Sequence, residues 1–304
     1  MHTSRRNFLV VTAGAALLTA CKNDRDSGSV SGGSDASTEG STGDNSSAVP
    51  DPTVPPRFGI VQRFPSGNLF TPGEVRLPVS ITDGQNLLPS GPETIPGWIE
   101  TLAGERVADV VAQRRNDGIS IAYWEVRAAL DAAKVFTLHL EGDDGYGASF
   151  EVWEAENVST PNLGEGLPPF DTPTVDDHRG VEPYCSLTPA PCPLHELTLA
   201  EALEQGKPVA YMVGTPAHCS TGTCAPGLEF LVEEHERLGD AVLMVHADVY
   251  ADEAGTEIAP AVLALNVTYE PIIYLTDADG TVVDRLDGVW DRGELRERLD
   301  KLVG

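Results

Sequence analysis

The chain has 304 residues, of which 47 are acidic (Asp or Glu) and 20 are basic (Lys or Arg), so its formal net charge at pH 7 is −27. A chain of this length accommodates one or two domains. The charge excludes nucleic acid as a partner, because binding to phosphates requires clustered lysine and arginine side chains. Such acidity keeps a protein soluble.

The first residues carry two motifs of protein export. The stretch S-R-R-N-F-L-V (Ser4–Val10) resembles a twin-arginine export signal, and the apolar run after it is too short to span a bilayer. That run ends in L-T-A-C (Leu18–Cys21), which resembles the lipobox of lipoproteins. The two motifs predict a signal peptide over residues 1–21 and lipidation of Cys21. We therefore expect an exported lipoprotein, anchored through its lipid to the extracytoplasmic face of the cell membrane.

Composition divides the next part of the chain into a tether and a β-rich domain. Residues 22–57 are rich in Ser, Gly, Asp and Thr and have no large apolar cluster, which predicts a flexible tether. Over residues 58–155, short apolar runs recur between Gly, Pro, Asn and Asp clusters, and several alternate with period two. About seven strands of this kind predict an all-β, immunoglobulin-like sandwich. The ligand of this domain is not indicated.

The C-terminal part has a different periodicity. Residues 156–183 are rich in Pro, Gly and Asp and are interpreted as a linker. Over residues 184–304, the pattern predicts a helix, a strand, a helix, a strand, a helix, two strands and a helix. The capping box T-L-A-E (Thr198–Glu201) predicts the start of the first helix, and D-R-G-E (Asp291–Glu294) that of the last. This order predicts an α/β domain whose mixed sheet is covered on both faces.

The cysteines predict two disulfides. Lipidation would use Cys21, and an even remainder in an exported protein favours disulfide bonds over free thiols. Proximity in the sequence favours pairing Cys185 with Cys192 and Cys219 with Cys224. The first pair is interpreted as a structural disulfide, because P-A-P stiffens its loop and no helix starts directly after it.

The order of elements, with two cysteines between the first strand and the next helix, resembles the thioredoxin-like superfamily over roughly the last 120 residues. The resemblance implies a thioredoxin-like fold in which Cys219 is the nucleophile and Cys224 the resolving cysteine. It also implies that Pro271 of Y-E-P is the cis-proline beside the active site. Three features depart from the family: the spacing is C-x-x-x-x-C, His218 stands where tryptophan is usual, and the preceding strand lacks a buried acid.

Local chemistry predicts that this cysteine pair is reactive. The N-terminus of a helix presents unpaired N–H groups and a positive dipole end, which stabilise a thiolate. His218 would add to this effect if it is protonated or donates a hydrogen bond. We expect Cys219 to be the more exposed sulfur and Cys224 to be shielded in the first turn of the helix. The predicted activity is thiol–disulfide exchange on extracytoplasmic protein thiols and disulfides.

Two other functions stay open at this point. The C-x-x-x-x-C spacing also resembles the cysteine pair of a peroxiredoxin-type thiol peroxidase. A non-catalytic, anchored binding or scaffold protein would use the pair only as a structural disulfide. No organic cofactor is expected, because the sequence has no glycine-rich nucleotide fingerprint. His195 near Cys192 and His218 beside Cys219 leave an unusual metal site open, but no metal site is expected, because lone histidines more often pack or cap.

Overall fold

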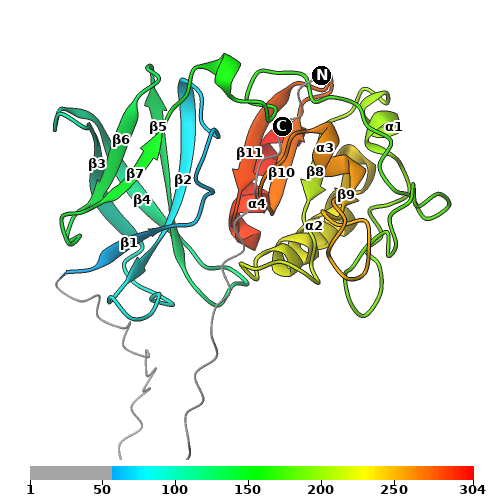
Figure 1. Ribbon diagram of the computed structural model, residues 1–304, viewed down its shortest axis with the longest axis horizontal. Coiled ribbons are helices and arrows are strands. Elements are labelled where there is room, and N and C mark those ends of the chain that lie inside the picture. The colour runs from blue at the N-terminus through cyan, green and yellow to red at the C-terminus, as the bar shows by residue number, and fades with distance from the viewer. Residues whose placement is uncertain (1–56) are drawn as a thin grey trace, which may run out of the picture. The chain divides into compact units, whose positions relative to one another are not determined.

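The computed structural model describes residues 57–304, so the predicted signal peptide, Cys21 and nearly all of the predicted tether lie outside the described residues. Within the described range, no helix combines the length and the apolar composition needed to cross a bilayer. The range belongs to one compact unit. It contains a seven-stranded sheet followed by a four-stranded sheet with helices (Figure 1).

The first sheet is antiparallel throughout, with the strand order β1-β2-β5-β4-β3-β6-β7. Its strands are β1 (Gly59–Gln62), β2 (Gly73–Thr82), β3 (Thr94–Thr101), β4 (Arg106–Arg115), β5 (Tyr123–Leu130), β6 (Val135–Leu140) and β7 (Ala148–Glu151). Alternation in the sequence decides which face is inside: Val110 and Ala112 of β4 are buried, whereas Val111 between them is exposed. The fully buried Trp124 belongs to the same core.

The number of strands agrees with the prediction, but the predicted division into two sheets of a sandwich does not. All seven strands are hydrogen-bonded into one sheet. The reason is that β3 and β4 form a long hairpin, while β4 also pairs with β5 and β3 with β6, so the pairing never breaks. The first and last parts of this sheet also meet, through a bridge between Phe70 and Val152 and a hydrogen bond from Gln62 Nε2 to the Ser149 carbonyl.

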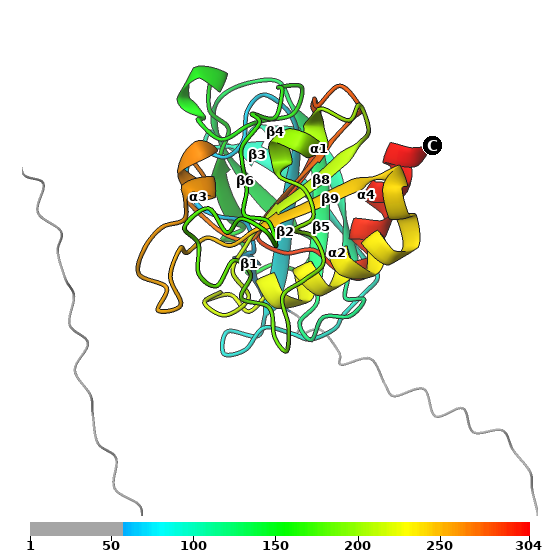
Figure 2. The same ribbon diagram turned by 90° about the vertical axis from the view of Figure 1, so that its right-hand side faces the viewer.

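The second sheet has the strand order β11-β10-β8-β9, with β8 parallel to β9 and the other pairs antiparallel. The elements are α1 (Leu199–Leu203), β8 (Val209–Val213), α2 (Cys224–Leu238), β9 (Leu243–Ala247), α3 (Pro260–Ala264), β10 (Ile272–Thr276), β11 (Val282–Asp287) and α4 (Arg292–Val303). This confirms the predicted order of elements and the mixed sheet. Figure 2 shows α1 and α3 on one side of β8 and β9, and α2 and α4 on the other.

Strand β8 shows how the sequence covers both faces. All of its residues are buried, so the strand reads as a continuous apolar run. Tyr211 packs in the core with α1 and α3, whereas Met212 packs in the core with α2 and α4. The predicted capping box at Thr198 is present, since the Thr198 hydroxyl accepts from the Glu201 N–H and the Glu201 carboxylate accepts from the Thr198 N–H.

Residues 156–183, interpreted from the sequence as a linker, pack against the second sheet. Leu167 is buried in its core, and the Arg285 guanidinium donates to the carbonyl of Pro161 and to Asn162 Oδ1. The segment has no α-helix or strand of its own. Its backbone groups instead form individual hydrogen bonds outside regular elements, such as the bond of 2.9 Å from Leu167 N–H to the Gly280 carbonyl.

A buried ion pair joins the two sheets. The carboxylate of Glu294, at the start of α4, accepts from Nε of Arg76 at 2.7 Å and from its Nη2 at 2.6 Å. Glu294 is fully buried and Arg76 is nearly so. The hydroxyl of Tyr123 also donates to Glu294. Arg76 and Tyr123 come from β2 and β5, so this carboxylate ties α4 to the seven-stranded sheet.

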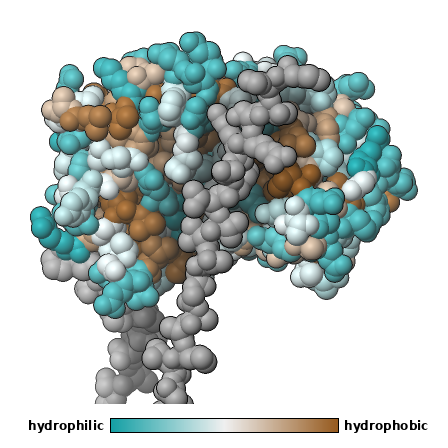
Figure 3. Space-filling model, in the orientation of Figure 1, coloured by the Kyte–Doolittle hydropathy of each residue, from teal (hydrophilic) through white to brown (hydrophobic). Residues whose placement is uncertain are grey.

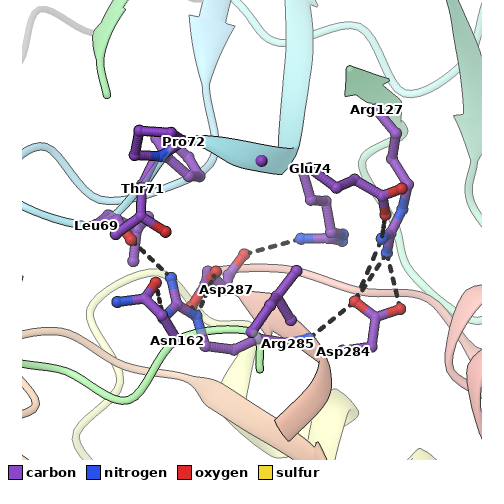
Figure 4. Close-up of a pocket in the computed structure, with 13 residues that line it drawn as sticks. Leu69, Thr71, Pro72, Glu74, Arg127, Asn162, Asp284, Arg285 and Asp287 are labelled. Carbon is purple, nitrogen blue, oxygen red and sulfur yellow. Dashed lines mark hydrogen bonds and ion pairs between the residues drawn. The ribbon is translucent and has the colours of Figure 1, made fainter. Parts of the chain in front are cut away.

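Charged groups around this pair extend the contact (Figure 4). Arg127 of β5 donates to Glu74 of β2 at 2.8 Å and reaches Asp284 of β11 at 3.2 Å. Arg285 Nη2 donates to the Leu69 carbonyl at 2.9 Å, and its Nε lies 3.1 Å from Asp287. These side chains line a pocket of about 180 Å³ between β2 and β11.

Replacing Glu294 by alanine should destabilise the protein by about 3–5 kcal/mol, because Arg76 would stay buried without its partner. Glu297→Ala is the matched control, since Glu297 lies on the same helix and pairs with Arg115 but has a side chain that is 43% exposed. We expect the control to lose at most about 1 kcal/mol. Urea denaturation measures both values, and equal losses would contradict the assigned role of Glu294.

Candidate functional site

The redox loop, which we define as residues 215–223, connects the end of β8 to the start of α2. Cys219 and Cys224 are joined by a disulfide, with their Cα atoms 6.0 Å apart. Gly222 reverses the chain between them with φ of 68°, a left-handed conformation that favours glycine. Its N–H donates to the Cys219 carbonyl at 3.2 Å, which closes the turn. The longer spacing therefore still brings the two sulfurs together.

The two sulfurs have different surroundings. Cys224 is fully buried as the first residue of α2, whereas Cys219 is partly exposed on the loop. The N–H of Cys224 points at Sγ of Cys219 over 3.3 Å, so the start of the helix directs a donor at this sulfur. Such a donor, together with the helix dipole, stabilises a thiolate on Cys219 when the disulfide is reduced. In the disulfide-bonded form, Cys219 is therefore the more exposed of the two residues.

The peptide bond between Glu270 and Pro271 is cis, as predicted. Pro271 lies directly before β10 and across from the end of β8. A Cβ atom built on Gly214 would lie 3.2 Å from Cβ of Pro271 and 3.6 Å from Sγ of Cys224. Glycine at this position therefore lets the proline segment and the buried sulfur approach the end of β8 closely.

A carboxylate missed by the sequence analysis lies beside the disulfide. Oε2 of Glu270 is 3.5 Å from Sγ of Cys224, and it accepts from the Thr215 N–H at 2.5 Å. Burial raises the pKa of Glu270, although the Thr215 hydrogen bond opposes the shift. In the thioredoxin-like pattern the buried acid belongs to the strand that corresponds to β8, whereas this acid is the residue directly before Pro271.

His218, predicted to assist Cys219, is held by another loop. Its Nε2 donates to the Glu253 carbonyl at 2.9 Å, and its ring packs edge-on against Tyr250. Gly255 lies so close to the ring that a Cβ atom there would be 2.9 Å from it. His218 thus fixes the first half of the redox loop against residues 250–255.

Cys185 and Cys192, predicted to form a structural disulfide, are free and buried in this structure. Their sulfurs lie 3.8 Å and 3.7 Å from Nδ1 of His246, a residue of β9. Proximity in the sequence brought the two cysteines together as expected, but a distant histidine occupies the space beside both. Burial raises the pKa of the neighbouring Asp248 to about 6.

A groove runs beside the redox loop. It has a volume of about 350 Å³ and is lined on one side by Thr221 and Glu270 and on the other by Arg63 and Phe64, which follow β1. The backbone of Arg63 passes so close to Gly288 that any side chain on Gly288 would collide with its carbonyl. The β-rich part therefore supplies one wall of the groove, which the sequence analysis did not anticipate because it treated the domains separately.

Comparisons with known proteins give few matches. No family model matches the chain, and no curated protein matches it. A solved structure described as the thiol:disulfide interchange protein DsbE from Chlorobium tepidum is 13% identical, with a TM-score of 0.35, and covers 48% of this chain and 100% of its own. A second, described as a thiol:disulfide interchange protein of the thioredoxin family from Chlorobium tepidum TLS, is 14% identical, with a TM-score of 0.34, and covers 47% of this chain and 99% of its own.

The raised pKa of Glu270 predicts a pH-dependent effect of Glu270→Gln on the oxidised protein. The folded protein holds the Glu270 proton to higher pH than the unfolded chain, where the pKa is about 4.3. The contribution of protonated Glu270 to the stability of the folded protein is therefore present at low pH, and it is lost as pH rises through the folded-state pKa of Glu270. Glutamine does not ionise, so the stability of the variant relative to the unmodified protein should increase between about pH 4 and pH 7.

Urea denaturation of both proteins at several pH values measures this difference. Glu229→Gln, at an exposed position of α2, is the matched control for the loss of one carboxylate. A difference for Glu270→Gln that stays constant from acidic to neutral pH would contradict the prediction.

Proposed function

We propose that this protein is a thiol–disulfide oxidoreductase of the thioredoxin-like superfamily that acts on protein thiols and disulfides outside the cytoplasm. One observation carries the proposal: a partly exposed Cys219 is bonded to a fully buried Cys224 at the first residue of a helix. A disulfide that only pins a loop has no need for one accessible sulfur and an N–H directed at it. The order of strands and helices supports the family assignment.

The exchange proceeds in two steps. A substrate thiolate attacks Sγ of Cys219, the bond to Cys224 breaks, and its electron pair leaves on Sγ of Cys224. A second substrate thiolate then attacks the substrate sulfur of the mixed disulfide and releases Cys219 as a thiolate. The substrate leaves with a disulfide and the protein keeps two cysteines in reduced form. The same steps in reverse reduce a substrate disulfide.

Glu270 assists the reactions of Cys224, the buried cysteine of the pair. A thiolate forming on Cys224 inside the protein is costly because it has left water. The Glu270 carboxyl group, 3.5 Å away, can supply a proton to that thiolate and take it back when Cys224 attacks. A raised pKa suits this role, since it keeps a larger fraction of Glu270 protonated.

The groove beside the redox loop suits a polypeptide substrate. Its walls include Thr221 of the redox loop, Glu270 before the cis-proline and Arg63 of the β-rich part. An extended chain lying there would place a thiol next to Cys219 while its backbone meets polar groups on both sides. In this proposal the β-rich part contributes to substrate binding.

Substitution of each cysteine separates their roles. Cys224→Ser should trap substrates on Cys219 as mixed disulfides, because the resolving sulfur is absent. Cys219→Ser is the matched control and should trap almost none, since Cys224 is fully buried. Non-reducing electrophoresis followed by mass spectrometry measures the trapped species. If neither variant traps a partner and both cysteines alkylate equally slowly, the pair is a structural disulfide and the proposal fails.

The same variants test for a peroxidase. A peroxidatic Cys219 in Cys224→Ser would form a sulfenic acid with hydrogen peroxide far faster than a free thiol does. We expect a rate no higher than the larger thiolate fraction of Cys219 accounts for. A much faster reaction would favour the peroxidase over the oxidoreductase.

We further propose that the protein works at the extracytoplasmic face of the membrane. The motifs Ser4–Val10 and Leu18–Cys21 support export and lipidation of Cys21. Cys21→Ser should move the protein from the membrane fraction to the soluble exported fraction, because the lipid would be absent. Fractionation followed by immunoblotting measures this shift, and a variant that stays in the membrane fraction would show that the anchor lies elsewhere.

A further inference from the structure

A second cluster of chemically reactive side chains lies away from the redox disulfide. Its members are Cys185, Cys192, His195 and His246, all of them buried. One ligand atom from each lies within 4.8 Å of every other. We propose that these four residues bind one Zn²⁺ ion as a structural site, contrary to the expectation from the sequence that the chain has no metal site.

The spacing of the ligand atoms matches a tetrahedral site. With Zn–S bonds of about 2.3 Å and Zn–N bonds of about 2.0 Å, neighbouring ligand atoms should be roughly 3.3–3.8 Å apart. Nδ1 of His246 lies 3.8 Å from Sγ of Cys185, 3.7 Å from Sγ of Cys192 and 3.2 Å from Nε2 of His195. The three distances from His246 Nδ1 are therefore close to those of a tetrahedral zinc site, and the remaining pairs of ligand atoms lie within 4.8 Å of each other.

The hydrogen bonds of the two histidines direct their free nitrogens at each other. Nε2 of His246 donates to the Gly214 carbonyl at 2.8 Å, and Nδ1 of His195 donates to the Pro173 carbonyl at 3.1 Å. The remaining nitrogens, Nδ1 of His246 and Nε2 of His195, then carry lone pairs and face each other. Two such nitrogens in a buried site need a proton donor or a cation beside them, and one metal ion would satisfy both nitrogens together with the two sulfurs. Donation of the second ring N–H to a carbonyl is also the usual arrangement for a metal-bound histidine.

The chemistry of the four ligands favours zinc. Two thiolates balance the charge of one Zn²⁺, so the occupied site is neutral, as a buried site should be. Equal numbers of thiolate and imidazole ligands form a common structural zinc site, in which the protein fills all four positions. Cys185 also lines a surface pocket of about 250 Å³ with His218 and Asp248, which gives an ion a path to the cluster.

The location of the ligands explains what the ion would do. Cys185, Cys192 and His195 lie on the long irregular segment before α1, whereas His246 lies in β9. An irregular segment of this length is held in place by few regular hydrogen bonds. Zinc would crosslink it to the central sheet. A disulfide between Cys185 and Cys192 would instead close only a short local loop and leave the two histidines facing each other without a cation.

The test measures zinc on the full-length protein, purified without chelators. We expect about one zinc per chain by elemental mass spectrometry. Protein stripped with a chelator and a reductant should bind Co²⁺ with the absorption bands of a tetrahedral thiolate complex. Cys192→Ser and His195→Gln should each weaken zinc binding by at least about 100-fold. The matched controls Cys219→Ser and His178→Gln, the latter at a partly exposed histidine of the same segment, should bind zinc unchanged.

A measurement on the unmodified protein covers the case in which a variant does not fold. Zinc should protect Cys185 and Cys192 from alkylation in the native protein, and a chelator should remove the protection. The proposal is overturned if peptide mapping of the protein isolated without reductant finds Cys185 bonded to Cys192. It is also overturned if the reduced protein takes up neither Zn²⁺ nor Co²⁺, or if both ligand variants bind zinc as tightly as the controls.

Discussion

The carboxylate of Glu294 is the group on which the arrangement of the described chain depends. It is fully buried, and Arg76 and Tyr123 reach it from the seven-stranded sheet while its own backbone starts α4. A buried ion pair is not by itself a strong source of stability, but an unpaired charge in the same place is strongly unfavourable. Any other arrangement of the two sheets that moves Glu294 away from Arg76 is therefore unfavourable. The pair thus selects one arrangement of the sheets.

That arrangement determines the surroundings of the redox loop. With the sheets held together, the segment after β1 passes over Gly288 and forms a wall of the groove beside Thr221. Gly214 connects the redox loop to the rest of the sheet. Its carbonyl accepts from His246, and a Cβ atom built on Gly214 would lie 3.6 Å from Sγ of Cys224. A chain of contacts through His246 and Gly214 thus connects Cys185 and Cys192 with Cys224.

Local patterns in the sequence were enough to predict the elements of the C-terminal part. The capping box at Thr198, the buried strand Val209–Val213 and the helix that ends before Gly239 all depend on residues close together in the chain. Asp291 likewise caps α4 through the Glu294 N–H, as predicted. The side chain of Glu294 does not complete the box, because it bonds to Arg76, 218 positions away. No local pattern carries that information.

The same distinction between local and long-range information applies to the candidate site. The Cys219–Cys224 bond and the cis-proline could be predicted, because a motif within one loop or one short segment specifies each of them. The position of Glu270 beside the disulfide and the environment of Cys185 could not be predicted. The contact of Glu270 with Cys224 joins segments about 50 residues apart, and so does the contact of His246 with Cys192. Such contacts depend on how these segments pack. The single sheet of the β-rich part differs from the predicted sandwich for the same reason, since it depends on the pairing of β2 with β5 and of β3 with β6, which are far apart in the sequence.

The use of arginine between the sheets has a consequence for the exterior. Only 20 residues of the chain are basic, and Arg76, Arg285 and Arg298 are buried in ion pairs with acidic groups. Hydrophilic residues are interspersed with apolar patches on the face drawn in Figure 3. Because each of these buried arginines is paired with a buried acid, the net charge of −27 is carried by the rest of the chain, and the outer field of the molecule is strongly negative. Such a field speeds the approach of cationic polypeptides and slows that of anionic ones, and salt weakens both effects because the field is screened within about 8–10 Å at physiological ionic strength.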